Sequence, residues 1–301
     1  MISVLILTKN EEVDLPSCLA SLSWCDDVHV YDSFSTDRTP QIALAAGARL
    51  YQRVFDDYAS QRNAALAEVP FRHEWILILD ADERPSPELS AEMLLAVATV
   101  APDTNAFRLI RRDYFWGTWL RHAQITPWYI RLIRRGHAHY TRAINEVLEV
   151  DGKVQGLTQP LFHYPFSKGI SYWVRRHDIY STLEANLIHQ RGGLQNPSWN
   201  KALFARDISE RRLHQKAIFY RLPGRSLVKL AYMLFVRRAI LDGSAGIRYA
   251  LLQSIYEYLI VLKTQELERI DTHGLAEVAA SEQNGKQNPE TAAGDAQTNQ
   301  K

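Results

Sequence analysis

Short, almost continuous apolar runs recur along the first eighty residues, and most are followed by a stretch with helical spacing. The apolar runs fall at residues 2–7, 28–31, 48–54 and 75–79, and the helical stretches at residues 13–22, 40–46 and 60–69. Apolar strands that alternate with helices are typical of a mostly parallel sheet covered on both faces. In such sheets the ligand binds beyond the carboxyl ends of the strands. We therefore predict an α/β fold with its functional groups just after these strands.

The rest of the chain has a different pattern. Residues 106–166 contain basic, aromatic and β-branched segments, which predict further strands joined by irregular loops. After Lys168 the spacing is helical, near residues 169–191, 198–219, 225–241 and 246–269. Beyond Val278 no large apolar residue remains to be buried, which predicts disorder. We expect a first domain at residues 1–167, a helical, basic and amphipathic region at residues 168–272, and a disordered tail at residues 273–301.

Composition excludes several classes of protein. The chain has 301 residues with 35 Lys and Arg, 34 Asp and Glu, and 46% hydrophobic residues, so it is not wholly disordered and has no net charge that favours nucleic acid. Cys18 and Cys25 are too few for a disulfide framework or a four-cysteine zinc site, and we expect core thiols. A basic leader is absent, and no apolar stretch approaches the ~20 residues that span a bilayer, so we expect a cytoplasmic protein without a transmembrane helix.

Polar clusters follow three of the predicted strands, at residues 8–12, 32–39 and 80–84. The first two are also explained as helix caps, because hydroxyl and carboxylate oxygens satisfy the free N–H groups of a helix start. The third cluster holds Asp80, Asp82 and Glu83, which repel one another unless a positive group neutralises them. Mg²⁺ or Mn²⁺ would do so, since hard oxygen ligands suit these ions and Mg²⁺ often bridges carboxylates to phosphates.

Taken together, the clusters resemble the family 2 glycosyltransferases, whose fold is the GT-A nucleotide-sugar-binding α/β sheet. The matching segments are Leu7-Thr8-Lys9-Asn10-Glu11, Asp32-Ser33-Phe34-Ser35-Thr36-Asp37-Arg38-Thr39, Gln61-Arg62-Asn63 and Asp80-Ala81-Asp82-Glu83. Later segments are similar to the subgroup that adds glucose, in a β-1,4 linkage, to the inner core of lipopolysaccharide. These are Phe115-Trp116-Gly117, Arg131-Leu132, Asn145-Glu146-Val147-Leu148, Gly152-Lys153-Val154, His163-Tyr164 and Leu241-Asp242-Gly243 with Gly246. The resemblance covers about residues 1 to 265.

The resemblance implies a set of donor-binding residues. Thr8, Asn10, Glu11 and Asp32 would hold the nucleoside, with Asp32 accepting a hydrogen bond from the edge of the base, and Arg62 would lie near the nucleotide. Asp80 and Asp82 would hold the ribose and the metal ion, Mg²⁺ or Mn²⁺, on the diphosphate. A UDP-sugar is the favoured donor. A metal ion neutralises the charge that develops on a diphosphate leaving group without any proton transfer.

The acceptor hydroxyl must lose a proton as it attacks the sugar, so a base is needed opposite the diphosphate. The subgroup usually carries a His-Glu pair at this position, whereas this chain has Asn145 and Glu146. We predict that Glu146 is the catalytic base. The alternative is a solvated strand carboxylate that alternates with Val147 and Glu149.

Several aromatic and basic residues have two interpretations. Trp116, with Trp119, Trp128 and Tyr129, would form a platform for a sugar or would pack against the sheet. Arg131 would meet an anionic acceptor, as would Arg134 and Arg135 unless they line a solvated strand edge. His163 would lie near the metal ion or diphosphate, or would be a structural histidine.

Charge is distributed unevenly along the chain. Residues 1–100 carry 7 basic and 16 acidic residues, whereas residues 201–240 carry ten Lys and Arg against only Asp207 and Glu210. These basic residues alternate with large apolar ones, a pattern typical of helices that lie on an anionic membrane surface. The alternative is a helical subdomain with a solvated basic face. A nucleic-acid partner is not expected, because no base-reading motif accompanies the charge.

These observations predict an inverting, metal-dependent glycosyltransferase that moves glucose from a nucleotide-sugar to a glycan or glycolipid acceptor, the lipopolysaccharide core, at the cytoplasmic face of the inner membrane. A nucleotidyltransferase would share the sheet and the carboxylates but would need a glycine-rich phosphate loop, and residues 8–12 contain no glycine. A non-catalytic sugar- or membrane-binding protein would not need the carboxylate cluster.

Overall fold

The computed structural model describes residues 1–124, 128–141, 147–190, 198–205 and 208–286. Two compact units are present in it. The first unit comprises Met1–Trp173 together with Met233–Ala250, and the second comprises Val174–Tyr232 together with Leu251–Lys301. Residues 233–250 thus belong with the sheet, which the sequence did not lead us to expect. The domain boundaries at residues 167 and 272 stay a prediction.

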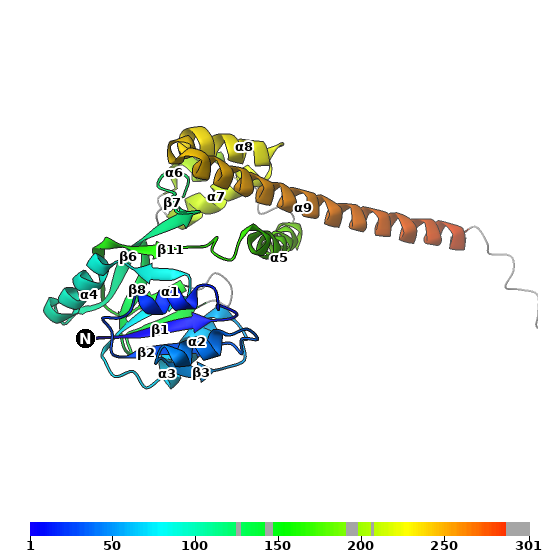
Figure 1. The fold of residues 1–301 in the computed structure, drawn as a ribbon. Coiled ribbons are helices and arrows are strands. Elements are labelled where there is room, and N and C mark those ends of the chain that lie inside the picture. The colour runs from blue at the N-terminus through cyan, green and yellow to red at the C-terminus, as the bar shows by residue number, and fades with distance from the viewer. Residues whose placement is uncertain (125–127, 142–146, 191–197, 206–207, 287–301) are drawn as a thin grey trace, which may run out of the picture. The chain divides into compact units, whose positions relative to one another are not determined.

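A nine-stranded sheet forms the centre of the first unit, in the order β3-β2-β1-β4-β8-β6-β11-β5, with β7 paired to β6 (Figure 1). Its strands are β1 (Ile2–Thr8), β2 (Val28–Asp32), β3 (Arg49–Gln52), β4 (Trp75–Asp80), β5 (Glu83–Pro85), β6 (Thr104–Phe115), β7 (Thr118–Trp119), β8 (Trp128–Arg134) and β11 (Lys153–His163). A separate hairpin pairs β9 (Ala138–Thr141) with β10 (Val147–Val150).

Parallel pairing joins the four N-terminal strands, β3-β2-β1-β4, as the sequence predicted. The second part of the sheet is mixed, because β8 runs antiparallel to both β4 and β6, while β6 and β11 are parallel to each other. The predicted α/β fold is confirmed.

Alternate residues of the central strands face opposite sides of the sheet, as the two-residue period of a strand requires. Val4, Ile6 and Leu77 belong to one apolar cluster, whereas Leu5 and Ile76 belong to another. Buried residues of α1 (Leu15–Ala20), α2 (Thr39–Ala45) and α4 (Pro87–Thr99) join the first cluster, and those of α3 (Tyr58–Glu68) join the second. Both faces of the sheet are therefore covered by helices.

Helix α4 was not expected from the sequence, although its start carries clear signals. Pro87 occupies its first position, and the hydroxyl of the preceding Ser86 accepts a hydrogen bond from the N–H of Leu89 at 3.0 Å. Proline at the first helical position and serine at the cap are both favoured there. This helix follows directly after the carboxylate cluster and β5.

Residues 233–250 fasten a loop of the first unit. They contain most of the π-helical turn η1 (Tyr232–Val236), the 3₁₀ turn η2 (Ala239–Asp242) and the start of α9 (Gly243–Lys286). The buried carboxylate of Asp242 accepts hydrogen bonds from the N–H groups of His122 and Ala123, at 2.9 and 2.7 Å, and contacts His122 Nδ1 at 2.7 Å. Gly246 permits a close approach, because a Cβ there would lie 2.1 Å from the carbonyl oxygen of Ala239.

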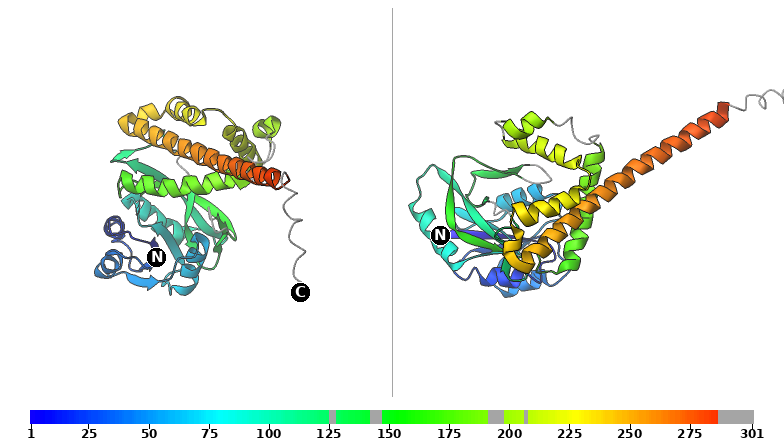
Figure 2. Two further views of the ribbon diagram at one scale, coloured as in Figure 1. Left: turned by 90° about the vertical axis from the view of Figure 1, so that its right-hand side faces the viewer. Right: turned by 90° about the horizontal axis from the view of Figure 1, so that it is seen from above.

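Helices make up the described part of the second unit: most of α5 (Ile170–Gln190), α6 (Trp199–Phe204), α7 (Ile208–Tyr220), α8 (Arg225–Ala231) and the remainder of α9. Arg225 pairs with Glu257 at 2.8 Å, and the Ser254 hydroxyl donates to the carbonyl oxygen of Ser226, which ties α8 to α9. Figure 2 shows α9 as one continuous helix.

The described part of α9 ends at Lys286, and the disordered tail at residues 273–301 stays a prediction. Residues 287–301 lie outside the described part of the chain. Among the described residues, no helix is both long and apolar enough to cross a membrane.

Candidate functional site

The carboxyl ends of β1, β2 and β4 meet at one edge of the sheet. Thr8 is in register with Asp32, and Leu7 is in register with Asp80. Three of the residues that the sequence singled out therefore come from adjacent strand ends, where an α/β sheet binds its ligand.

Asp32 organises the loops at this edge. It is fully buried, and its carboxylate accepts hydrogen bonds from Thr8 Oγ1 at 2.9 Å, from the N–H and hydroxyl of Ser35, and from Gln52 Nε2 at 3.1 Å. The predicted contact between Asp32 and a nucleoside base would have to replace one of these bonds. The bond from Gln52 is the longest of them and comes from a side chain on the outermost strand, β3.

Asn10 connects the loop after β1 to the loop after β2. Its side-chain oxygen accepts from the N–H of Thr36 at 2.8 Å, and its own N–H donates to the Ser35 hydroxyl at 2.8 Å. Asn10 and Phe34 both have positive φ angles, 56° and 55°, and the Phe34 side chain is exposed. A bulky residue in this conformation is strained, and such strain is concentrated at ligand-binding sites.

Glu11 forms an ion pair that the sequence analysis missed. Lys168 Nζ lies 2.6 Å from Glu11 Oε1 and also donates to the carbonyl oxygen of Asn10 at 2.9 Å. Burial raises the pKa of Glu11 to about 7, an effect that the lysine reduces but does not cancel. No local sequence signal reveals this contact, because the two residues are 157 positions apart.

Arginines neutralise the carboxylates that follow β4. Arg62 and Arg131 lie 3.0 and 2.6 Å from the two oxygens of Asp80, and Arg131 also lies 2.7 Å from Glu83. Although burial alone would raise the pKa of Asp80, these two guanidinium groups lower it well below its usual range. Asp80 and Glu83 are therefore neutralised by arginines and do not need a metal ion for this. Arg131 is buried and internally paired, and the structure does not place it as a surface group facing an acceptor.

Asp82 has a different partner. The Nε2 of His163 lies 3.3 Å from Asp82 Oδ2, and the Nδ1 of the same ring contacts the buried carboxylate of Asp113. Strand register explains this arrangement, since His163 on β11 pairs with Asp113 on β6 and with Glu83 on β5. Burial alone would lower the pKa of His163, but the two carboxylates outweigh it and raise the pKa to about 9.

Asp82 and His163 would form a two-residue ligand set for a divalent metal ion, and the His163 ring would give up its Nε2 proton to bind it. Asp113 fixes the orientation of the ring, as carboxylates commonly do for metal-binding histidines, and leaves Nε2 directed at Asp82. Within the described ranges no group of three or more His, Cys, Asp or Glu side chains is placed to hold a metal ion. A metal ion here would need further oxygens from a substrate, which is the usual mode for Mg²⁺ at phosphates.

The aromatic residues singled out in the sequence lie beneath arginines. The guanidinium carbon of Arg248 lies 5.4 Å from the ring centre of Trp116, and that of Arg112 lies 4.3 Å from the ring centre of Trp119. The guanidinium carbon of Arg108 lies 4.9 Å from the ring centre of Trp128, and that of Arg111 lies 4.3 Å from the ring centre of Tyr129. Trp116 is 60% exposed and has a positive φ of 48°. Of the four, Trp116 thus presents the most accessible face to a ligand.

Glu146, the predicted catalytic base, lies outside the described residues, as does Asn145. The neighbouring β10 is described, and there Glu149 accepts from the Thr141 hydroxyl at 3.0 Å. Cys18 and Cys25 both pack in the first apolar cluster, so the expectation of core thiols is confirmed.

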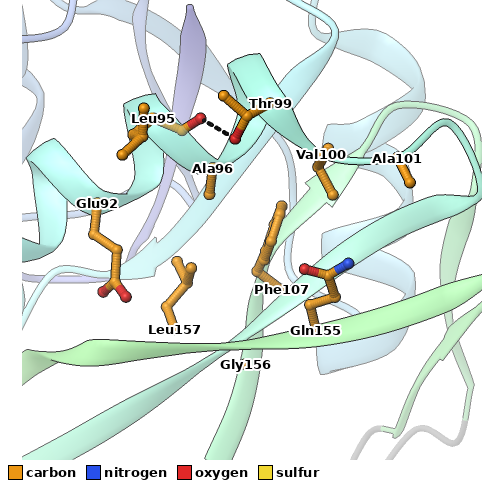
Figure 3. Close-up of a pocket in the computed structure, with 10 residues that line it drawn as sticks. All are labelled: Glu92, Leu95, Ala96, Thr99, Val100, Ala101, Phe107, Gln155, Gly156 and Leu157. Carbon is orange, nitrogen blue, oxygen red and sulfur yellow. Dashed lines mark hydrogen bonds between the residues drawn. The ribbon is translucent and has the colours of Figure 1, made fainter.

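A hollow of about 330 Å³ lies away from this edge, between the end of α4 and the amino-terminal parts of β6 and β11 (Figure 3). Leu95, Phe107 and Leu157 line it together with Glu92. Glu92 is occupied by the N–H groups of Thr158 and Gln159, both at 2.9 Å, and so fastens α4 to β11. We assign no role in the chemistry to this hollow.

The sheet, with hydroxyl, carboxylate and imidazole groups gathered at the carboxyl ends of its strands, is that of an α/β protein built to bind a nucleotide. Residues 3–151 match the model of glycosyl transferase family 2. The chain belongs to this family of enzymes.

Three curated relatives illustrate the similarity. The lipopolysaccharide core biosynthesis glycosyltransferase LpsC of Rhizobium meliloti is 29% identical over 223 residues, which cover 71% of this chain and 80% of LpsC. An uncharacterized glycosyltransferase of Rickettsia typhi is 26% identical over 88% of this chain and 87% of its own length. A TPR repeat-containing protein of Synechococcus elongatus is 37% identical over 37% of this chain, and the match spans about a quarter (27%) of that protein.

Among solved structures, glucosyl-3-phosphoglycerate synthase of Mycobacterium tuberculosis is similar over part of the chain. The match has 25% identity and a TM-score of 0.33, and it covers 37% of this chain and 44% of the synthase.

Proposed function

We propose that this enzyme transfers glucose, with inversion, from a UDP-sugar to a glycan acceptor of the lipopolysaccharide core. The observation that carries the proposal is the meeting of Thr8, Asp32, Asp80 and the Asp82–His163 pair at one edge of the sheet. The similarity to LpsC along 80% of that protein supports the lipopolysaccharide core as the acceptor.

The nucleoside would occupy the loops after β1 and β2. Thr8, Asn10 and Asp32 already hold these loops together by hydrogen bonds, so the loops are ordered before the donor arrives, and the base would displace one of the bonds to Asp32. Glu11 would accept from the ribose, and Asp80 with its partner Arg62 would lie beside the nucleotide. Loops ordered in advance reduce the ordering cost of binding.

Asp82 and His163 would hold Mg²⁺ or Mn²⁺ at the diphosphate, next to Asp80. The ion would supply positive charge for the leaving diphosphate. Asp113 would hold the imidazole in place, and the arginines around Asp80 and Glu83 would keep this end of the sheet ordered whether or not the ion is bound.

Glu146 is our proposed base. An inverting transfer is a single displacement, in which the acceptor oxygen attacks the anomeric carbon from the side opposite the diphosphate and gives up its proton to a carboxylate. Trp116 would support the sugar or acceptor, because its exposed aromatic face suits the apolar face of a pyranose.

We further propose that the basic helices at residues 201–240 contact an anionic membrane at the cytoplasmic face of the inner membrane. Exposed apolar side chains among the basic residues support this, such as Phe204, Leu227 and Phe235 at 76%, 69% and 68% exposure. The protein should sediment with vesicles that contain anionic lipid at low salt and not with zwitterionic vesicles. A protein that stays in solution with both would refute the membrane contact.

Nucleotide release from a panel of UDP-, GDP- and ADP-sugars, with and without Mn²⁺, tests the donor and the metal together. We expect release from UDP-glucose, dependent on the ion and stimulated by a lipopolysaccharide core acceptor. Turnover of a different nucleotide-sugar would overturn the donor assignment, and equal turnover in EDTA would overturn the metal ion.

A further inference from the structure

The segment after β11 connects the proposed metal-binding end of the site to the loop after β1. It begins beside Asp82, whose carbonyl oxygen accepts from the N–H of Tyr164 at 3.0 Å. It ends at Ser167 and Lys168, where the Ser167 hydroxyl donates to Asp14 at 2.7 Å and Lys168 contacts Glu11. Six residues, 163–168, thus extend from Asp82 and the proposed metal ligand His163 to the proposed nucleoside loop. A nucleoside diphosphate bound across this edge of the sheet would lie along them.

Most cations at this edge have structural partners. Arg62 and Arg131 are held by Asp80, and Arg111 lies 3.1 Å from Asp113. Lys9 donates to the carbonyl oxygens of Ser33 and Phe34, both at 2.7 Å, and so holds the loop after β2. Moving one of these arginines toward a ligand would take a partner from a carboxylate at this edge, and moving Lys9 would leave the loop without its donor.

Lys168 is placed differently. Its side chain is 13% exposed, and its Nζ contacts a single carboxylate, that of Glu11, and donates to the carbonyl oxygen of Asn10. The Nζ also stands 4.7 Å from the ring centre of Tyr172. Burial raises the pKa of its partner Glu11 more than the lysine lowers it, so the ionised carboxylate is disfavoured there although the contact stabilises it. A lysine is also a flexible point charge on a four-carbon stem, which can change partners by rotation of its side chain.

We infer that Lys168 binds the diphosphate of the donor, and that it leaves Glu11 to do so, which frees the Glu11 carboxylate to accept from the ribose. This inference rests on the proposed function. The exchange replaces one charge-assisted contact with another and brings a positive charge to the diphosphate from the side of the 163–168 segment. When no donor is bound, Lys168 and Glu11 pair with each other, so neither charge is without a partner.

Comparison of UDP with uridine isolates the diphosphate. Lys168→Met should weaken UDP binding by about tenfold or more, because contacts to charged groups are the strong ones, and should change uridine binding by less than about twofold. Titration calorimetry in the presence of EDTA and again with Mn²⁺ measures both ligands. Lys168→Arg should recover part of the UDP affinity. Lys153→Met is the matched control, since Lys153 is 71% exposed and pairs with Asp103 elsewhere on the sheet.

The outcomes separate this inference from the proposed function. Equal UDP affinity for wild type and Lys168→Met would overturn the inference, as would an equal loss of UDP and uridine affinity, because that pattern reports a disturbed loop. Failure of the wild-type protein to bind UDP at all would overturn the donor assignment itself. Glu11→Gln is the second variant: it changes the ribose contact for both ligands and releases Lys168, so the ratio of UDP affinity to uridine affinity should stay the same or rise. A selective loss of UDP binding in this variant would contradict the exchange.

Discussion

The ring of His163 joins Asp82 to Asp113: its Nε2 lies 3.3 Å from the Asp82 carboxylate, and its Nδ1 contacts the buried Asp113. If Asp82 and His163 bind the metal ion, Asp113→Asn should weaken Mn²⁺ binding in the presence of UDP by about 10- to 100-fold through ring orientation alone, and Asp82→Asn and His163→Gln should each weaken it by at least as much. Electron paramagnetic resonance of free Mn²⁺ measures this. His73→Gln is the control, because His73 pairs with Asp26 at the amino-terminal end of β4. Unchanged Mn²⁺ affinity in all three site variants would exclude this site.

Replacement of Glu146 by Gln should abolish sugar transfer and leave UDP-sugar affinity nearly unchanged. The amide cannot take a proton from the acceptor, while the donor contacts lie on other segments. Initial rates with saturating donor, together with a donor titration, separate the two effects. Glu149→Gln, on the adjoining strand β10, is the control and should retain activity. Substantial turnover by the Glu146 variant would remove it from the role of base.

Loss of the Arg131 guanidinium should destabilise the fold strongly. Arg131→Met leaves Asp80 and the fully buried Glu83 without their shared partner, and breaking a buried ion pair in this way costs about 3–5 kcal/mol. Urea denaturation followed by circular dichroism gives the free energy of unfolding. Arg134→Met is the matched control, since its partner Glu74 is 65% exposed, and it should cost less than about 1 kcal/mol. The double variant Arg131→Met/Glu83→Gln should regain part of the lost free energy of unfolding, because it no longer buries an unpaired charge at residue 83. A double variant as unstable as Arg131→Met alone would argue against a charge effect.

Acid should weaken the fold partly through Asp27. Burial alone would raise the pKa of Asp27, but hydrogen bonds from the Ser3 hydroxyl, the N–H of Arg72 and His29 outweigh it and lower the pKa well below its usual range. A carboxylate whose pKa is lower in the folded than in the unfolded state stabilises the fold. This stabilisation is complete above about pH 4, the pKa in the unfolded state, and is lost as the pH falls through the pKa in the folded state. Asp27→Asn should therefore cost about 2 kcal/mol at pH 7 and less at pH 3.

Denaturation curves at the two pH values test this, with the exposed Asp103→Asn as control. An Asp27→Asn penalty that is the same at both pH values would contradict the assignment of the stability to the ionised carboxylate.

Asp242 should stabilise the loop that it holds. Asp242→Ala removes the acceptor for the N–H groups of His122 and Ala123 and should cost about 1–3 kcal/mol, because buried donors are left unsatisfied. Hydrogen exchange at these two amides should accelerate more than at the strand amides of β1. Asp151→Ala is the control, with a side chain that is 92% exposed. Unchanged protection of both amides would show that Asp242 does not hold the loop.

The N-terminal part of the sheet could be predicted because the pattern that specifies each strand lies within a few consecutive residues. Residues 75–79 form a continuous apolar run, and Asp80 follows at once, so both the buried strand and the polar strand end are visible within a few residues. The same reasoning placed Thr8 and Asp32 at adjacent strand ends, since parallel strands align their carboxyl ends.

The partners of these groups could not be predicted, because they come from distant parts of the chain. The neutralising group for Asp80 and Glu83 is Arg131, about fifty residues later, and the sequence suggested a metal ion and an anionic acceptor in place of this ion pair. Lys168 reaches Glu11 only because β11 returns to the sheet beside β6 and β5. Strand order and register create these contacts, and neither is encoded in local spacing.

The chain passes between the two units three times, at residues 173/174, 232/233 and 250/251, so the first unit is discontinuous along the gene. A protein truncated after Trp173 would keep every strand of the sheet and lose the carboxylate that anchors His122 and Ala123. Recombination that exchanged the helical unit between relatives would therefore have to replace residues 174–232 and residues 251–301 and preserve residues 233–250 between them. The unit that carries the chemistry can be inherited intact only if both of its pieces are kept together.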